Sequence, residues 1–139
     1  MNEGRVSFVE VARVQQVLER ILGGSLRSVT PDAIGEMLGP VDWKPVEGWD
    51  SQSDSIVAST AGLFSAGFSS RLLVVTDVSF YPGRGAFSVA SEDLPSFVST
   101  YSVRYGESFF DGDAIVVEEL GKRVWIFHHE GVCACVTVQ

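Results

Sequence analysis

The chain is poor in the residues on which metal and nucleophilic chemistry depend. Its 139 residues include two histidines and two cysteines, and all four lie within the short segment His128 to Cys135. The Gly-x-Ser-x-Gly elbow of hydrolases is missing. One residue separates the two cysteines, which is not the spacing of a disulfide framework. Outside this segment no complete catalytic set is visible, so we expect a protein that is not an enzyme.

Long apolar segments are also missing. Uninterrupted apolar runs such as Leu72–Val75 are far shorter than the roughly 20 residues that span a bilayer. The first residues, Met-Asn-Glu-Gly-Arg-Val-Ser, contain no apolar core of a secretory signal. We therefore expect no membrane association and a cytoplasmic location.

Basic residues are scarce. Lys and Arg number 10 against 18 Asp and Glu, which gives a formal net charge of −8. The acidic residues concentrate in residues 30–54 and 107–119. A nucleic-acid partner requires a basic face, so this pattern argues against one. A basic protein partner fits, because opposite charges speed encounter and select partners. An acidic surface that serves only solubility is the alternative.

The length and a hydrophobic content of 45% predict one domain over residues 1–139 with a core of its own. Ser7 and Glu10 match a capping box before a helix over residues 8–22. Thr30 and Pro31 begin a second, shorter helix that ends at Gly39-Pro40. Further helices are predicted over 55–68, where the Ser, Thr and Gly content weakens the pattern, and over 92–104.

Six segments have the composition of strands: 41–46, 71–77, 86–90, 114–120, 123–129 and 132–138. Glu130-Gly131 fits a two-residue hairpin loop between the last two. Helices early and consecutive strands late predict an α+β fold. We expect a mostly antiparallel sheet that ends in a C-terminal β-meander, with three to four helices packed mainly on one face.

This hairpin loop would place His128 opposite Cys133, with Cys135 on the same face of the sheet. The three side chains could then hold zinc, or an imidazole could activate a thiol. However, Cys-x-Cys in a regular strand does not wrap an ion, and no oxyanion hole is evident. Buried thiols beside a hydrogen-bonded histidine are the ordinary interpretation. We therefore expect no metal or cofactor, and keep a small metal-dependent or thiol enzyme as the alternative.

Two runs near the C-terminus, residues 109–117 (FFDGDAIVV) and 124–131 (VWIFHHEG), resemble the C-terminal halves of bacterial immunity proteins. Such proteins neutralise polymorphic or contact-delivered toxins. The resemblance implies a compact, acidic, cytoplasmic protein that binds one toxin domain and covers its active site. The charge agrees with a basic toxin, often a nuclease. A protein-interaction module without a toxin is another possibility.

The most distinctive candidate for a partner contact is Trp49, which lies among acids in a polar loop. An aromatic anchor beside charges is typical of interface hot spots, although Trp49 could instead fill its own core. Asp111-Gly112-Asp113 lacks the spacing of a calcium loop. The predicted partner-binding residues are Asp42, Glu47, Trp49, Asp50, Asp54, Asp111 and Asp113.

Overall fold

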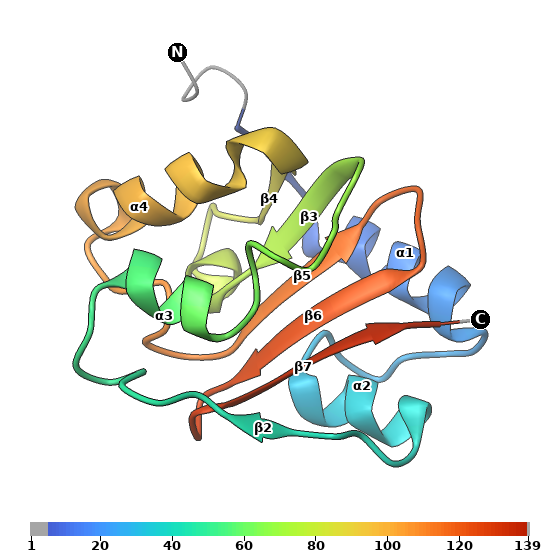
Figure 1. Ribbon diagram of the computed structural model, residues 1–139. Coiled ribbons are helices and arrows are strands. Elements are labelled where there is room, and N and C mark those ends of the chain that lie inside the picture. Colours follow the sequence, from blue (N-terminus) through green and yellow to red (C-terminus); the bar gives the residue numbers. More distant parts are fainter. Residues whose placement is uncertain (1–5, 139) are drawn as a thin grey trace.

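A seven-stranded antiparallel sheet forms the centre of the molecule (Figure 1). The computed structural model describes residues 6–138, so Met1–Arg5, which entered the expectation of no secretory signal, lie outside the described residues. The strand order is β1-β4-β3-β5-β6-β7-β2. The strands are β1 (Ser7–Val9), β2 (Lys44–Pro45), β3 (Arg71–Val75), β4 (Ala86–Ala90), β5 (Ala114–Glu118), β6 (Arg123–His128) and β7 (Val132–Thr137). The α+β class and the C-terminal β5–β6–β7 meander are confirmed.

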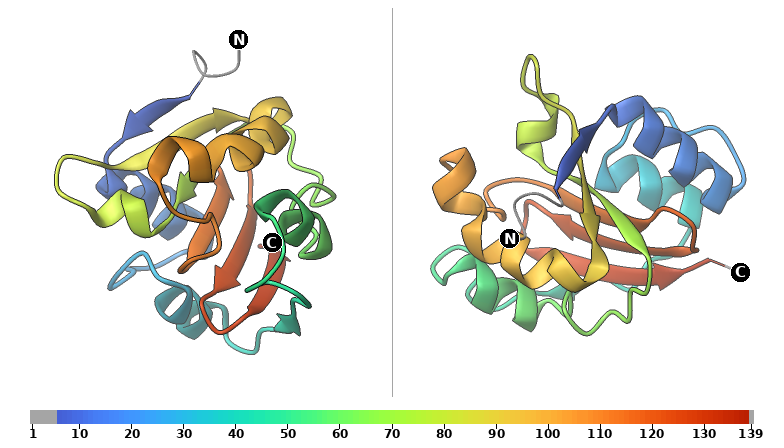
Figure 2. Two further views of the ribbon diagram at one scale, coloured as in Figure 1. Left: turned by 90° about the vertical axis from the view of Figure 1, so that its left-hand side faces the viewer. Right: turned by 90° about the horizontal axis from the view of Figure 1, so that it is seen from above.

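Helices cover both faces of this sheet (Figure 2). They are α1 (Val11–Leu22), α2 (Pro31–Leu38), α3 (Asp54–Thr60) and α4 (Leu94–Tyr105), with single 3₁₀ turns η2 (Asp77–Phe80) and η3 (Ser91–Asp93). α1 and α2 lie on one face, and α3 and α4 lie on the other. The expectation that the helices pack mainly on one face is therefore wrong. Among residues 6–138, none of the helices is both long and apolar enough to traverse a membrane.

The central strands explain why both faces are covered. Successive side chains of a strand point to opposite faces, and in β3 both sets are apolar. Leu73 and Val75 are buried against α1 and α2, whereas Leu72 and Val74 belong to the core beneath α3 and α4. Strands β5 and β6 repeat this pattern, so an uncovered face would leave apolar surface in water.

The predicted helix starts have different outcomes. Thr30 caps α2, because its Oγ1 accepts a hydrogen bond from the Ala33 N–H at 3.2 Å. Ser7 caps no helix. It belongs to edge strand β1 and pairs with Ser88, and α1 begins after Glu10 without a side-chain cap.

Two predicted elements are shorter than the sequence indicated. The helix expected over 55–68 ends at Thr60, and Gly62 follows with a φ of 74°. The strand expected over 41–46 is reduced to Lys44–Pro45 at the sheet edge. A proline cannot donate to a strand ladder, which fits this edge position.

The β6–β7 hairpin differs from the expected register by one residue. His128 pairs with Val132, so the loop contains three residues, His129 to Gly131, and Gly131 has a φ of 86°. Because successive side chains of a strand point to opposite faces, this shift places each β7 side chain on the face opposite to the one expected. Cys133 now pairs with Phe127.

Candidate functional site

The register of this hairpin separates the predicted His–Cys cluster. His128 is on the face covered by α2, whereas Cys133 is buried in the core beneath α3, with its Sγ 3.6 Å from the Ala61 carbonyl oxygen. Cys135 points to the same face of the sheet as Cys133, but it is exposed. Desolvation by the surrounding protein raises the pKa of both thiols. The predicted His128–Cys133–Cys135 cluster does not form, because the histidine and the two thiols lie on opposite faces of the sheet. The raised pKa values also differ from the lowered pKa of an activated thiol.

The two acidic segments meet at the start of α3, where Asp54 contacts two residues that lie 54 and 55 positions further along the chain. Asp54 accepts hydrogen bonds from the Ser108 hydroxyl at 2.5 Å and from the Phe109 N–H at 2.9 Å. These bonds join the loop that follows α4 to the first residue of α3. Asp54 therefore acts within the fold, while its predicted contact with a partner stays a prediction.

A groove of about 260 Å³ lies where these loops meet. We call it the Trp49 groove, and it is lined by Trp49, Asp50, Ser51, Gln52, Ser108, Phe110 and Asp111. The Trp49 ring is partly buried and packs on Phe127 with ring centroids 5.9 Å apart. Trp49 thus contacts its own core and also lines a surface groove. A core-filling role is therefore compatible with a contact to a partner, which stays a prediction.

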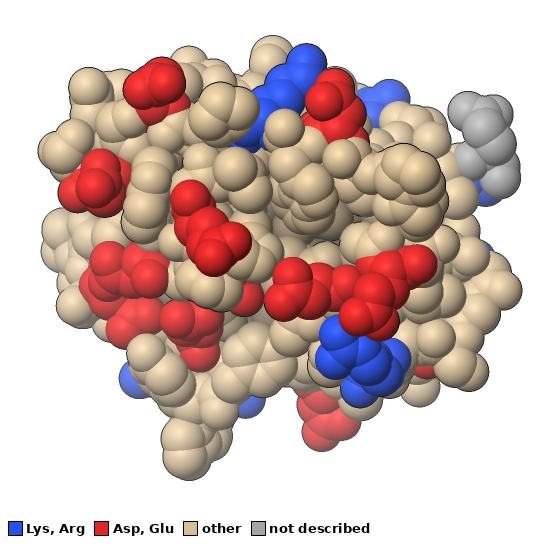
Figure 3. Space-filling model, turned by 90° about the horizontal axis from the view of Figure 1, so that it is seen from below, with Lys and Arg blue, Asp and Glu red and all other residues tan. Residues whose placement is uncertain are grey.

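Further acids lie beside the groove. The pKa of Asp77 is raised, mainly by desolvation and then by the charges of Asp113 and Glu107. Tyr81 donates a hydrogen bond to Glu107 at 2.9 Å, which raises the pKa of the tyrosine. We call the set Asp50, Asp77, Glu107, Asp111 and Asp113 the acidic face. Figure 3 shows acidic side chains gathered in a band on the side of the molecule that carries β2.

Two of the predicted contacts, Asp42 and Glu47, do not line the Trp49 groove. Asp42 is exposed 3.9 Å from the Lys44 ammonium and lines a separate cavity with Cys133 and Cys135. Glu47 is exposed in the loop after β2. The structure therefore brings Trp49, Asp50 and Asp111 to one groove, with Asp113 close by on the acidic face.

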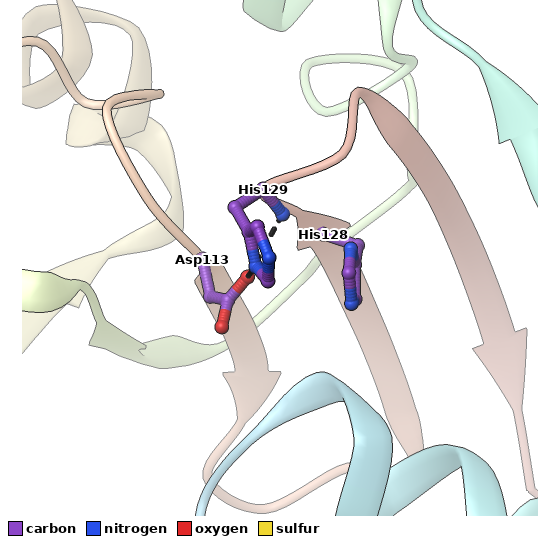
Figure 4. Close-up of side chains that lie close together, drawn as sticks. All are labelled: Asp113, His128 and His129. Atoms are coloured by element: carbon purple, nitrogen blue, oxygen red, sulfur yellow. Dashed lines mark hydrogen bonds and ion pairs between the residues drawn. The ribbon is translucent and has the colours of Figure 1, made fainter.

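The sequence analysis missed a cluster formed by Asp113, His128 and His129 (Figure 4). Asp113 Oδ1 accepts a hydrogen bond from the His129 backbone N–H and lies 2.8 Å from His129 Nδ1. This contact raises the pKa of His129. The two imidazole rings stack with centroids 4.3 Å apart and planes 25° from parallel.

A cleft of about 490 Å³ opens beside His128, between α2 and the β6–β7 hairpin. We call it the α2 cleft, and its lining includes Asp32, Glu36, Trp43, His128 and Glu130. His128 Nε2 lies 3.3 Å from Asp32 Oδ1 across this cleft. The pairing of Ala114 with Phe127 brings Asp113 next to His128, and a correct β5–β6 register would have indicated this from the sequence.

Comparison of the chain with protein-family models, with curated proteins and with solved structures gives no match. The function therefore has to be inferred from the geometry of the acidic face and its surroundings.

Proposed function

We propose that this chain is an immunity-type binding protein whose acidic face takes up a basic toxin domain and covers the toxin's active site. The protein acts in the cytoplasm and performs no catalysis of its own. The single observation that carries the proposal is the convergence of the two acidic segments on the Trp49 groove.

The acidic face offers both charge and anchoring surface. Its carboxylates supply a field that attracts and orients a basic domain. Trp49 lines the groove, and Tyr81, which donates to Glu107 of the acidic face, is 47% exposed. Aromatic side chains near the centre of an interface commonly carry most of its binding energy. Charge alone would serve solubility, but exposed aromatics among the charges favour a binding surface.

The thiol-enzyme alternative has lost its geometric basis, because His128 and Cys133 lie on opposite faces of the sheet. A protein-interaction module that binds a basic partner other than a toxin would use the same groove. The identity of the partner distinguishes these two functions.

The proposal predicts that a neighbouring gene encodes the toxin domain, and the test uses that domain. We expect the wild-type chain to restore growth of cells that express this domain and to inhibit the purified domain at equimolar ratio. The double variant Asp50→Asn/Asp111→Asn should lose protection, because both carboxylates line the groove.

The matched control is Glu10→Gln/Glu92→Gln, which removes the same charge. Both glutamates are exposed and follow β1 and β4, at the sheet edge opposite β2. This control should protect like the wild type. Failure of the wild-type chain to protect, or equal loss in both double variants, would contradict the proposal.

A further inference from the structure

The β6–β7 turn concentrates the whole histidine content of the chain at one point. One ligand atom each from Asp113, His128 and His129 lies within 4.8 Å of the others. Two imidazoles and one carboxylate form a ligand set used by zinc and other divalent transition metals. The three residues come from two adjacent strands, since Asp113 directly precedes β5 and His128 ends β6.

The hydrogen bonds around His129 prepare it for metal ligation. Asp113 faces Nδ1 at 2.8 Å, so the proton of a neutral ring lies on Nδ1 and the lone pair of Nε2 is exposed. A carboxylate behind a histidine is the usual outer partner of a zinc-bound imidazole, because it fixes the tautomer and raises the basicity of the ligand. His129 is 57% exposed as a side chain, so an ion can reach Nε2 from solvent.

His128 provides a second nitrogen with an acid beside it. Its Nδ1 accepts a hydrogen bond from the Glu130 N–H at 3.2 Å, so a neutral ring carries its proton on Nε2, which faces Asp32 Oδ1 at 3.3 Å. An ion that binds Nε2 therefore displaces this proton to Nδ1, where Glu130 Oε1 lies 3.7 Å away. Neighbouring ligands of a tetrahedral zinc ion with bonds of about 2.0–2.1 Å are roughly 3.4 Å apart. The Asp32–His128 separation thus equals a ligand–ligand edge of such a site.

We propose that His128 and His129, with Asp32 as an oxygen ligand and Asp113 as the outer partner of His129, form a binding site for a divalent zinc-class ion at the mouth of the α2 cleft. The metal site shares Asp113 with the acidic face, but zinc binding is tested without a partner and does not rest on the proposed toxin binding. Mg²⁺ is not the ion that it fits, since magnesium prefers an all-oxygen shell and binds imidazole poorly.

Metal binding requires a small adjustment of the rings. Imidazole lone pairs lie in the ring planes, and the two planes are only 25° from parallel, so the lone pairs do not converge in the stack. The exposed His129 ring can turn to bring its nitrogen toward the ion. The α2 cleft, which His128 lines, gives the ion its entry path and leaves room for a bound water.

The experiment is a titration of ZnCl₂ into chelator-treated protein without an affinity tag, followed by calorimetry. We expect one equivalent of zinc to bind, with a parallel MgCl₂ titration giving no saturable heat. Because the chain has two histidines, ¹⁵N spectra of the imidazoles should show both ring systems shifted at one equivalent. His129→Ala and His128→Ala should each weaken binding by about tenfold or more.

The two cysteines are the competing zinc ligands, so Cys135→Ser is the control variant. It should bind zinc with the wild-type affinity. Far-UV circular dichroism shows whether each variant is folded, and the exposure of His129 makes His129→Ala the variant that decides. No saturable zinc binding, or loss of binding in Cys135→Ser with retention in His129→Ala, would overturn the proposal. Neither result bears on protection against the toxin.

Discussion

At the scale of single residues, Gly131 determines where Trp49 lies. A Cβ added to Gly131 would clash with the indole Nε1 of Trp49, and the glycine also has a φ of 86°. No other residue type combines this backbone conformation with such a close approach. The position of the groove's aromatic anchor therefore depends on a glycine in the neighbouring hairpin.

Gly131→Ala should destabilise the protein by about 2–4 kcal/mol, from the left-handed backbone and the overpacking against Trp49 together. The control is Gly83→Ala, whose φ is 77° but whose added Cβ meets nothing within 4 Å. It should cost only the backbone part, about 1–2 kcal/mol. Denaturant unfolding monitored by tryptophan fluorescence measures both. Equal losses in the two variants would show that Trp49 does not rest on Gly131.

The cysteines give a second prediction at this scale. Because desolvation raises the pKa of both thiols, the thiolate fraction at a given pH is smaller than in a free thiol, and reactivity should rise only at higher pH. Alkylation of Cys133 in Cys135→Ser, and of Cys135 in Cys133→Ser, should therefore be no faster than that of a model thiol at pH 7. The buried Cys133 should be the slower one. A Cys133 that reacts faster than the model thiol would restore the nucleophile hypothesis.

At the scale of elements, the N-terminus of α2 is the helix start best defined by the sequence. Thr30→Ala removes the hydroxyl that accepts from the Ala33 N–H and should cost about 1 kcal/mol of stability. Ser7→Ala changes an exposed strand residue and should stay within about 0.5 kcal/mol of the wild type. Thermal unfolding compares them directly. A larger loss in Ser7→Ala would mean that a cap forms at α1 after all.

Elements with strong local signals were predictable from the sequence. The strand expected over 86–90 matches β4 (Ala86–Ala90), and the helix over 92–104 matches α4 within two residues. Segment 55–68 was harder because its apolar spacing continues past Thr60. There the chain turns, and the Ala61 carbonyl accepts a hydrogen bond from the Trp125 indole. Gly62, with its positive φ, is the local signal for this turn, whereas the contact with Trp125 leaves no local trace in the sequence.

The candidate site was less predictable than the elements. The composition around Trp49 and Asp111 predicted partner contacts, which stay a prediction, and nothing local showed that Asp54 would join the two loops around a groove. The His128–Cys133 cluster failed on one residue of loop length, which decides the face of every side chain in β7. The Asp113–His129 contact was missed for a different reason, because it depends on the pairing of Ala114 with Phe127 between β5 and β6.

At the scale of the whole molecule, the uninterrupted apolar character of the central strands indicates that helices cover both faces of the sheet. Sheets covered on one side alternate between apolar and polar residues, whereas β3, β5 and β6 are apolar on both faces. The sequences of the strands, rather than those of the helices, therefore indicated on which faces the helices would pack. The two covered faces leave the loops at the strand ends as the places where polar groups can gather, and the acidic face is built from such loops.

The net charge of −8 leads to the last prediction, which concerns association kinetics with the basic partner. Exposed charges are screened over about 10 Å at 0.1 M salt, so the association rate should fall steeply as ionic strength rises. Asp50→Asn/Asp111→Asn should flatten this dependence, while Glu10→Gln/Glu92→Gln should change it little. Trp49→Ala should act mainly on dissociation, because buried anchors set complex lifetimes. Stopped-flow measurements across a salt series separate the two rates. If the association rates of the wild type and of both double variants do not change with salt concentration, the acidity serves solubility. The proposed interface then has no electrostatic basis.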